Sequence, residues 1–359
     1  MRIDRVVFVQ GLVWLLICGA ATSQETRTPA WSLHNRAQVD FSHDNNVEES
    51  LRNPQAAQSL RLMTHFKATR RTLKWNLGAS YQGGLQFYPN FALENKLINE
   101  LHCSISRELI SGVKAGVQIF GRLKLFLNRE TDYLFGHLTP FIQVQLPRQS
   151  SFQVSFRNET LDYGGTNFYD YKSPGFHLQI NKTLFTRFTL SPQFSYGKYF
   201  LDRPAYDVHP FWETWRTTSD KQTDQSHSYG LSLDGWLAGA LVNVNFRFEK
   251  YQSNSYGYSF RRQALTVVFA KEWHEILVRG YSSLQIKSYL DNLLPISPIT
   301  LDTEQEENNF VILDVSREFA GSFVGLLRAG WYKNESPWAN LYYEKWLFNL
   351  GVEYRFTND

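Results

Sequence analysis

Hydrophobic and polar residues alternate along most of the chain with a period of two. Near the C-terminus, apolar residues occupy every even position from Trp346 to Phe356, and polar residues such as Glu353 and Arg355 fill most of the odd positions. The same alternation recurs around residues 73–81, 113–119 and 242–248. Because successive side chains of a β-strand point to opposite faces, this period predicts strands with one apolar and one polar face.

About sixteen such strands are predicted, within a range of 14–18. They centre on residues 31–42, 58–69, 73–86, 95–106, 112–125, 134–146, 151–162, 170–181, 185–198, 226–237, 241–251, 260–271, 274–288, 308–317, 322–333 and 342–356. The connections alternate between tight turns, such as 147–150, and longer polar loops, such as 162–170. Seven tight turns and eight longer loops fit sixteen antiparallel strands whose two ends lie on the short-turn side.

This pattern predicts an all-β fold, a transmembrane antiparallel up-and-down β-barrel with short periplasmic turns and long extracellular loops. Strands of 10–14 residues can cross a bilayer when they are tilted. In lipid every backbone polar group needs a partner, so the sheet has to close. A β-sandwich usually has shorter strands. Aromatic residues near strand ends are expected to face the membrane interfaces; they are Trp31, Phe126, Phe152, Tyr196, Tyr229, Trp273, Trp331 and Phe356.

The first 23 residues have the layout of a secretory signal peptide. Two arginines precede an apolar run from Val6 to Ala21, and small residues precede the expected cleavage after Ser23. A membrane-anchor helix is the alternative, although the apolar run is short and is interrupted by Gln10. The predicted organisation is a signal peptide at 1–23, a short N-terminal segment at 24–30, a barrel at 31–356 and a C-terminal tail at 357–359.

Composition argues against several other functions. The net charge of +3 is too weak a bias to suggest a nucleic-acid partner. The nine histidines show no metal-ligand spacing, so neither a metal nor a cofactor is expected. No nucleophile-elbow motif occurs, and catalytic residues are not expected. The neighbouring pairs Ser42–His43 and Ser226–His227 keep a barrel lipid hydrolase open as a less favoured alternative.

The terminal segment LGVEYRF resembles the C-terminal strand of Gram-negative outer-membrane β-barrels. Leu350, Val352, Tyr354 and Phe356 match its apolar–aromatic pattern, although three further residues follow Phe356 here. The segment AQVDFSHDNNVEES also resembles the first strand and loop of large porin-like barrels, including some associated with exopolysaccharide operons. The resemblance implies export to the outer membrane of a diderm bacterium, contact with outer-membrane lipid and lipopolysaccharide, and recognition of the last strand by the barrel-assembly machinery.

The predicted inward face is richer in basic than in acidic residues. The pore-lining candidates are Arg36, Arg61, Lys74, Lys114, Arg122, Arg247, Arg279, Arg328 and Arg355. A sixteen-stranded barrel is wide enough for an aqueous channel, and a basic lining would favour anions. The alternative is that these side chains pair with lumenal carboxylates and only stabilise the wall.

Three functional hypotheses follow from this pattern. The leading one is a porin-like channel that passes polar or anionic solutes, saccharides included. The second is a structural, assembly or polysaccharide-secretion barrel with a blocked lumen, and the hydrolase comes third. The longest predicted loop, 199–225, is rich in aromatic residues and is expected to constrict the pore, to bind a sugar or to pack outside the barrel. A homo-oligomer stays open.

Overall fold

Each predicted alternating segment forms an antiparallel strand that pairs with its neighbours in sequence. The computed structural model describes residues 31–50, 52–128, 132–165, 168–185, 187–208, 215–291, 309–334 and 343–356. Its strands are β1 (Ser32–Asp44), β2 (Ala57–Arg71), β3 (Trp75–Phe87), β4 (Lys96–Ile110), β5 (Val113–Phe126), β6 (Tyr133–Leu146), β7 (Ser150–Tyr163), β8 (Tyr171–Leu184), β9 (Phe188–Val208), β10 (Trp215–Leu237), β11 (Ala240–Ser253), β12 (Phe260–Trp273), β13 (Ile276–Tyr289), β14 (Asn309–Ala320), β15 (Phe323–Asn334) and β16 (Tyr343–Phe356). One three-residue 3-10 helix, η1 (Ala92–Glu94), lies between β3 and β4.

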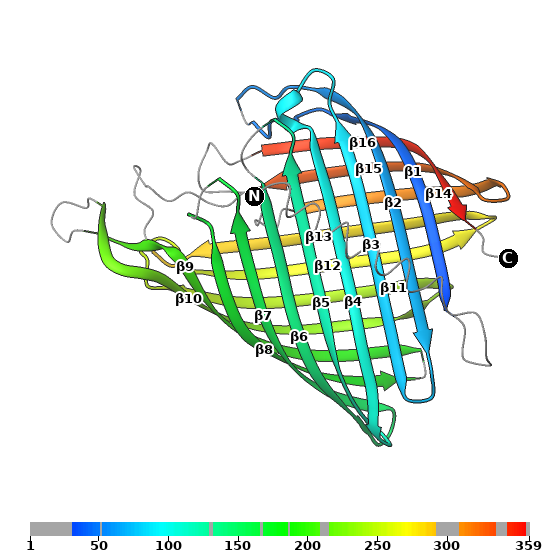
Figure 1. Ribbon diagram of the computed structural model, residues 1–359, viewed down its shortest axis with the longest axis horizontal. Coiled ribbons are helices and arrows are strands. Elements are labelled where there is room, and N and C mark those ends of the chain that lie inside the picture. Colours follow the sequence, from blue (N-terminus) through cyan, green and yellow to red (C-terminus); the bar gives the residue numbers. More distant parts are fainter. Residues whose placement is uncertain are drawn as a thin grey trace.

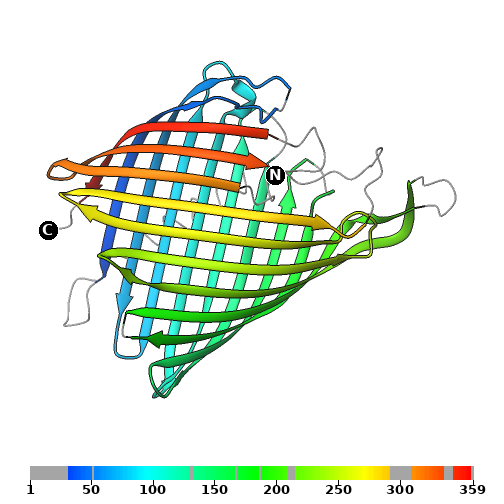
Figure 2. The same ribbon diagram turned by 180° about the vertical axis from the view of Figure 1, so that it is seen from behind.

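The sixteen strands form one closed barrel, which confirms the predicted fold class and strand number. Tight turns and longer connections alternate as predicted. The first residue of β1 and the last residue of β16 both lie at the short-turn end. In Figures 1 and 2 the near and far walls cross at a steep angle, as expected when tilted strands wrap around a barrel.

The first and last strands close the ring. Val39 lies opposite Val352, and Phe41 lies opposite Leu350, in a register that runs from Asn35–Phe356 to Asp44–Leu347. This pairing removes the two free edges that an open sheet would expose to lipid.

The terminal segment is therefore a wall strand. Its apolar residues Leu350, Val352, Tyr354 and Phe356 are all exposed on the outer surface of the barrel. The intervening residues Glu353 and Arg355 point into the lumen, where both take part in ion pairs.

The β9–β10 hairpin departs from the prediction. Residues 199–225 were expected to form a loop, but β9 continues to Val208 and β10 begins at Trp215. The two strands stay paired beyond their neighbours, with register shifts between Thr217 and Thr223. Figures 1 and 2 show this hairpin projecting beyond the long-loop end of the barrel, so its described residues do not constrict the pore. Phe211 and Trp212 of the predicted loop lie outside the described residues.

Among the described residues, no helix is long and apolar enough to cross a membrane. The predicted signal peptide, the N-terminal segment at 24–30 and the tail at 357–359 lie outside the part of the chain that the structure describes.

Gly351 is required for close packing at the β1–β16 seam. It lies opposite Asp40, and a Cβ atom there would meet the Asp40 carboxylate and would lie 2.8 Å from the backbone oxygen of Val39. Such a Cβ would force the seam apart, because a contact under 3.0 Å with backbone cannot be relieved by a rotamer change.

We therefore expect Gly351→Ala to lower the free energy of unfolding by about 1–3 kcal/mol, the usual cost of overpacking. Urea unfolding of the refolded barrel in lipid vesicles measures this. The matched control is Gly121→Ala, since a Cβ at Gly121 meets nothing within 4 Å. Equal stability of the two variants would contradict the packing argument.

Candidate functional site

The strand register places nearly all of the predicted pore-lining residues on the inward face. Arg36, Arg61, Lys114, Arg122, Arg247, Arg279, Arg328 and Arg355 all share the face that carries the buried lumenal carboxylates. Lys74 is the exception, because it lies in the tight turn between β2 and β3 and is not a wall residue. The period-two pattern of the sequence includes Lys74, but β3 begins one residue later, at Trp75.

Asp314 is shared by two arginines from the strands on either side of it. Arg328 donates from Nε and Nη2 to the two carboxylate oxygens at 2.5 and 2.9 Å. Arg279 Nη2 lies 3.6 Å from Oδ2 of the same carboxylate. The Asp314 side chain is 6% exposed, whereas those of Arg279 and Arg328 are 31% and 36% exposed. The carboxylate thus lies against the wall, and both guanidinium groups face the water.

Glu353 repeats this arrangement at the seam. Arg36 Nη1 lies 3.2 Å from one carboxylate oxygen, and Arg355 Nε donates to the other at 2.8 Å. Glu353 is 3% exposed, and its two arginines are more than ten times as exposed. Next to it, Arg61 Nη2 donates to Asp40 at 2.7 Å, and Gln38 donates to the same carboxylate.

These groups form what we call the cationic arc, consisting of Arg279, Arg328, Arg355, Arg36 and Arg61 with Asp314, Glu353 and Asp40. It runs over β13–β16, β1 and β2, which are neighbours in the ring. Two of its three carboxylates each serve two arginines, and Arg355 Nη1 also lies 3.9 Å from Glu318 Oε2. The five arginines of the arc therefore outnumber the four carboxylates that pair with them. The sequence hypotheses of a basic lining and of structural ion pairs therefore both describe part of it.

The remaining candidates lie outside the cationic arc, on β5 and β11. Arg122 Nε donates to Glu100 at 2.7 Å, and both side chains are partly exposed. Lys114 faces the lumen from β5, opposite Glu108, and Arg247 faces it from β11, opposite Gly230.

Across the lumen from the cationic arc, the wall of β7–β11 carries a connected set of uncharged polar side chains, beside charged lumenal residues such as Glu159, Asp234 and Arg247. Gln179 donates to Asn181 of the same strand at 2.6 Å. From the next strands, Ser191 donates to Asn181 at 2.8 Å, and Gln193 donates to Ser232 at 2.9 Å. We call this surface the amide–hydroxyl arc, consisting of Ser151, Gln179, Asn181, Ser191, Gln193, Ser232 and Asn245.

The two Ser–His neighbours named from the sequence do not form catalytic pairs. Ser42 is buried on the lumenal face and bonds Ser59, whereas His43 points to the outer face. Ser226 donates to Glu249 at 2.6 Å, and His227 packs on the outward-facing Tyr196. Adjacent residues of a strand point to opposite faces, so such pairs cannot act together.

A different Ser–His contact forms between neighbouring strands. His177 Nδ1 and Ser195 Oγ lie 2.7 Å apart in the lumen, and His177 Nε2 lies 3.3 Å from Gln179 Oε1. No carboxylate hydrogen-bonds His177 among the described residues, so the contact belongs to the amide–hydroxyl arc rather than to a charged triad. Only the strand register brings these two residues together, so no local pattern in the sequence indicates the contact.

Aromatic side chains line the inner rim near the long-loop end. Tyr171, Tyr199, Tyr251 and Phe260 form a continuous series, with ring centroids 5.3, 5.7 and 4.8 Å apart. Phe126, predicted to face lipid, is in fact buried on the inward face beside Lys124, whose Nζ lies 4.7 Å from its ring centroid. Phe126 has the same even parity on β5 as Lys114 and Arg122, and this parity already indicates an inward side chain.

Loop residues reach the inner rim from outside the strands. Tyr88 packs with Val47 and Ala57, and burial raises the pKa of its phenol to about 12, so it stays neutral at physiological pH. Glu49 of the β1–β2 loop lies 2.5 Å from Nζ of the inward-facing Lys345. The described residues contain no group of three or more His, Cys, Asp or Glu side chains that could hold a metal ion.

Solved structures similar to this chain include bacterial outer-membrane proteins. Outer-membrane OmpT of Vibrio cholerae matches with 8% identity and a TM-score of 0.45, over 92% of this chain and 99% of that one. OccAB3 of Acinetobacter baumannii matches with 8% identity and a TM-score of 0.43, over 90% and 99%. A bacterial polysaccharide outer-membrane secretin matches with 7% identity and a TM-score of 0.42, over 90% and 98%.

These identities and TM-scores are too low for a solute or a partner to be transferred from those proteins. Scans against protein-family models and against curated proteins found no match to this sequence.

The shared carboxylate of Asp314 supplies a direct test of the cationic arc. We expect Asp314→Asn to lower the free energy of unfolding by about 1–3 kcal/mol, because two arginines lose their buried charged partner. The control is Glu275→Gln, whose ion pair with Arg317 is exposed on both sides and is worth under about 1 kcal/mol. Urea unfolding of both variants measures the difference, and a smaller loss for Asp314→Asn than for Glu275→Gln would refute the assignment.

Proposed function

We propose that this chain is an outer-membrane porin-like channel through which polar solutes diffuse, with a preference for anions. The tight turns face the periplasm and the long loops face the outside. The closed wall of strands of bilayer-spanning length supports the membrane location, because a barrel satisfies its backbone hydrogen bonds internally.

The observation that supports the anion preference is that the carboxylates of the cationic arc are more deeply buried than its guanidinium groups. The carboxylates of Asp314, Glu353 and Asp40 are nearly buried, and the guanidinium groups above them are partly exposed. A solute in the lumen therefore meets guanidinium groups first. In a confined channel such groups raise the local concentration of anions.

The amide–hydroxyl arc suits solutes that carry many hydroxyl groups. Amide and hydroxyl side chains both donate and accept hydrogen bonds, so they exchange partners with sugar hydroxyls without leaving a charge unpaired. Together the two arcs favour small saccharides that carry a carboxylate, sulfate or phosphate.

The second candidate is an assembly or polysaccharide-secretion barrel with a closed lumen. The contact between Glu49 and Lys345 favours it, because it draws the β1–β2 loop towards the inner rim of the barrel. Single-channel recording separates the two candidates: steady ohmic steps support diffusion, and a bilayer that stays silent with refolded protein present supports closure.

Selectivity is tested with one arginine of the arc. We expect a KCl gradient across the bilayer to give a reversal potential that shows chloride preference. Arg36→Gln should lower the chloride-to-potassium permeability ratio by about twofold, because one exposed charge is lost from a confined lumen. Glu353 keeps Arg355 as its partner in this variant.

The control for Arg36→Gln is Arg317→Gln, which removes the same charge from the outward face of β14. Its permeability ratio should equal that of the unaltered protein. Cation preference in the unaltered channel, or equal effects of the two substitutions, would rule out the cationic arc as the selective element.

We also propose that the barrel-assembly machinery recognises Leu350, Val352, Tyr354 and Phe356. Phe348 and Phe356 lie on the same face of β16 and are each 49% exposed, so they form a matched pair. We expect Phe356→Ala to reduce the folded fraction in outer membranes several-fold and Phe348→Ala to change it little. Heat-modifiable mobility on gels measures the folded fraction, and equal losses would indicate general destabilisation instead of recognition.

A further inference from the structure

Tyr199 lies flat against the lumenal wall, over a glycine of its own strand. A Cβ atom at Gly197, two residues earlier on β9, would lie 3.4 Å from Cε2 of Tyr199 and 3.6 Å from its hydroxyl oxygen. The ring therefore covers the backbone of Gly197 with one face. Because the side chain is only partly buried, the other face is open to the lumen.

Two further tyrosines hold this ring in place. Tyr171 on β8 meets it edge to face, with ring centroids 5.3 Å apart, and Tyr251 on β11 lies 5.7 Å away at an angle of 46°. Tyr171 donates to Glu159, and Tyr251 donates to Asp224, each at 2.7 Å. We call the three tyrosines the tyrosine platform. Because its flanks are fixed by hydrogen bonds, Tyr199 presents a preformed aromatic face.

The wall beside the platform has no side chain at two opposed positions. Gly175 on β8 pairs with Gly197 on β9, and no other two inward-facing glycines pair with each other in the described strands. Gly175 is required for strand packing, since a Cβ atom there would lie 2.5 Å from the backbone oxygen of Tyr196. At Gly197 a Cβ atom would make only ordinary contacts. The glycine at 197 thus serves the flat position of the Tyr199 ring.

Hydrogen-bonding side chains border this flat stretch. Towards the tight turns, the next inward residues of β8 and β9 are His177 and Ser195, which contact each other at 2.7 Å. Gln179 follows, 3.3 Å from His177. On β7, Arg157 lies directly opposite Gly175, and its side chain is 48% exposed. Hydroxyl, imidazole, amide and guanidinium groups therefore surround one aromatic face.

The charges nearest the platform are balanced. Three carboxylates each have an arginine counterpart: Arg157 Nη2 lies 2.6 Å from Glu159, Arg262 Nε donates to Glu249 at 3.0 Å, and Arg203 is joined to Asp224 through Gln222. Arg247 lies further towards the tight turns, opposite Gly230. A charged solute therefore gains little net attraction at the platform, in contrast to the cationic arc across the lumen.

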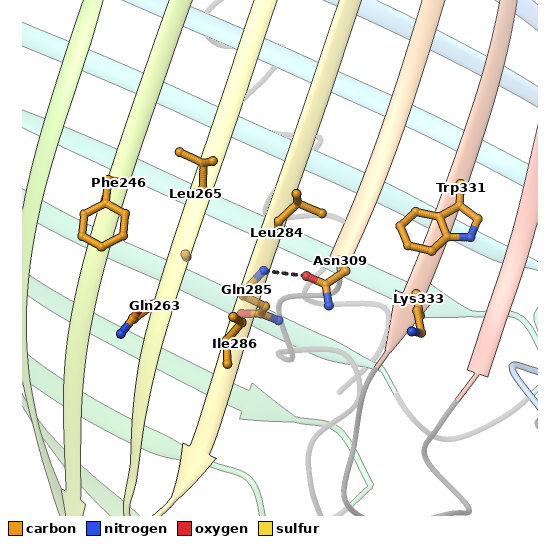
Figure 3. Close-up of a pocket in the computed structure, with 10 residues that line it drawn as sticks. Phe246, Gln263, Leu265, Leu284, Gln285, Ile286, Asn309, Trp331 and Lys333 are labelled. Carbon is orange, nitrogen blue, oxygen red and sulfur yellow. Dashed lines mark hydrogen bonds between the residues drawn. The ribbon is translucent and has the colours of Figure 1, made fainter.

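The outer wall presents its aromatic side chains differently. Figure 3 shows Phe246 on β11 and Trp331 on β15 separated by the apolar side chains of Leu265 and Leu284. Asn309 in the same view accepts a hydrogen bond of 2.5 Å from a backbone N–H of β13. In this part of the outer wall the rings stand among hydrocarbon side chains, whereas the platform ring stands among polar ones.

We propose that the tyrosine platform and the flat wall beside it bind one neutral pyranose sugar. The proposal rests on the proposed function, because a sugar reaches the platform only through an open lumen. The C–H face of the sugar ring stacks on Tyr199, since the face of an aromatic ring carries partial negative charge. The sugar hydroxyls exchange hydrogen bonds with Ser195, His177 and Arg157, which supply both donors and acceptors.

A pyranose meets all the demands of this site. It combines a flat apolar face with hydroxyl groups around its edge. An open-chain polyol has the hydroxyl groups but lacks the face. A small aromatic solute has the face but leaves the polar groups around it without partners, which costs free energy. An anionic sugar has no free positive charge to meet at the platform.

Saturation-transfer NMR on the full-length barrel, refolded in detergent, tests this binding. The probes are glucose, galactose and mannose, with sorbitol as the open-chain comparison. We expect saturation of the ring C–H protons of at least one hexose and a dissociation constant about fivefold higher for sorbitol. Tyr199→Leu, which keeps an apolar side chain but removes the ring, should weaken hexose binding about fivefold. Tyr199→Phe should keep it within about twofold of the unaltered protein.

The matched control is Tyr229→Leu, the same change on the outer face of β10, where Tyr229 is 55% exposed. It should bind the hexose as the unaltered protein does. Ser195→Ala leaves the ring in place and should raise the dissociation constant about threefold, because one hydroxyl partner is lost. Heat-modifiable mobility on gels shows which variants are folded, and Ser195→Ala decides the matter if Tyr199→Leu does not fold.

Four results would overturn the inference: no hexose binding, equal binding by Tyr199→Leu and Tyr229→Leu, sorbitol binding as tight as that of the best hexose, or tighter Tyr199-dependent binding of glucuronate or benzyl alcohol. Single-channel conductance is recorded on the same proteins. A conducting barrel that binds no hexose refutes the platform alone. A silent barrel whose hexose binding depends on Tyr199 refutes the proposed channel and leaves the platform intact.

Discussion

The backbone hydrogen bonds between β1 and β16 are the contacts on which the rest of this structure depends. They join residues more than three hundred positions apart and turn a sheet with two open edges into a ring. In a bilayer an open edge would leave a row of backbone N–H and C=O groups without partners. Closure also separates the two faces of every strand, so that one parity of residues meets lipid and the other meets the lumen. The proposed lumenal site follows from that separation.

Side-chain ion pairs accompany the backbone hydrogen bonds at the β1–β16 seam. Gly351 leaves room for Asp40, which accepts from Arg61 on the next strand, while Glu353 on β16 receives Arg36 from β1. Burying these carboxylates costs desolvation energy, which the short charge-assisted hydrogen bonds offset. The same ion pairs put guanidinium groups on the water side. One set of residues therefore pairs the two strands at the seam and places guanidinium groups in the lumen.

The errors of sequence interpretation have separate physical causes. Periodicity extends past the end of a strand into its turn, and this placed Lys74 on the wall. Strand pairing can also extend beyond the rim of the barrel. The segment 199–225 is polar and aromatic like a loop, yet β9 and β10 stay paired there. Phe126 shows that an aromatic side chain near a strand end is not by itself a lipid-facing residue, because a lysine beside it can make an inward site favourable.

Local alternation determined the number of strands, most of their bounds, their order and the face of nearly every charged residue. It could do so because an antiparallel up-and-down barrel pairs neighbours in sequence, so the pattern and the tight turns together specify the topology. The tertiary structure alone decided the register between strands. Register sets which arginine reaches Asp314 and which serine meets His177. Such contacts join different strands, and no pattern within a single strand contains them.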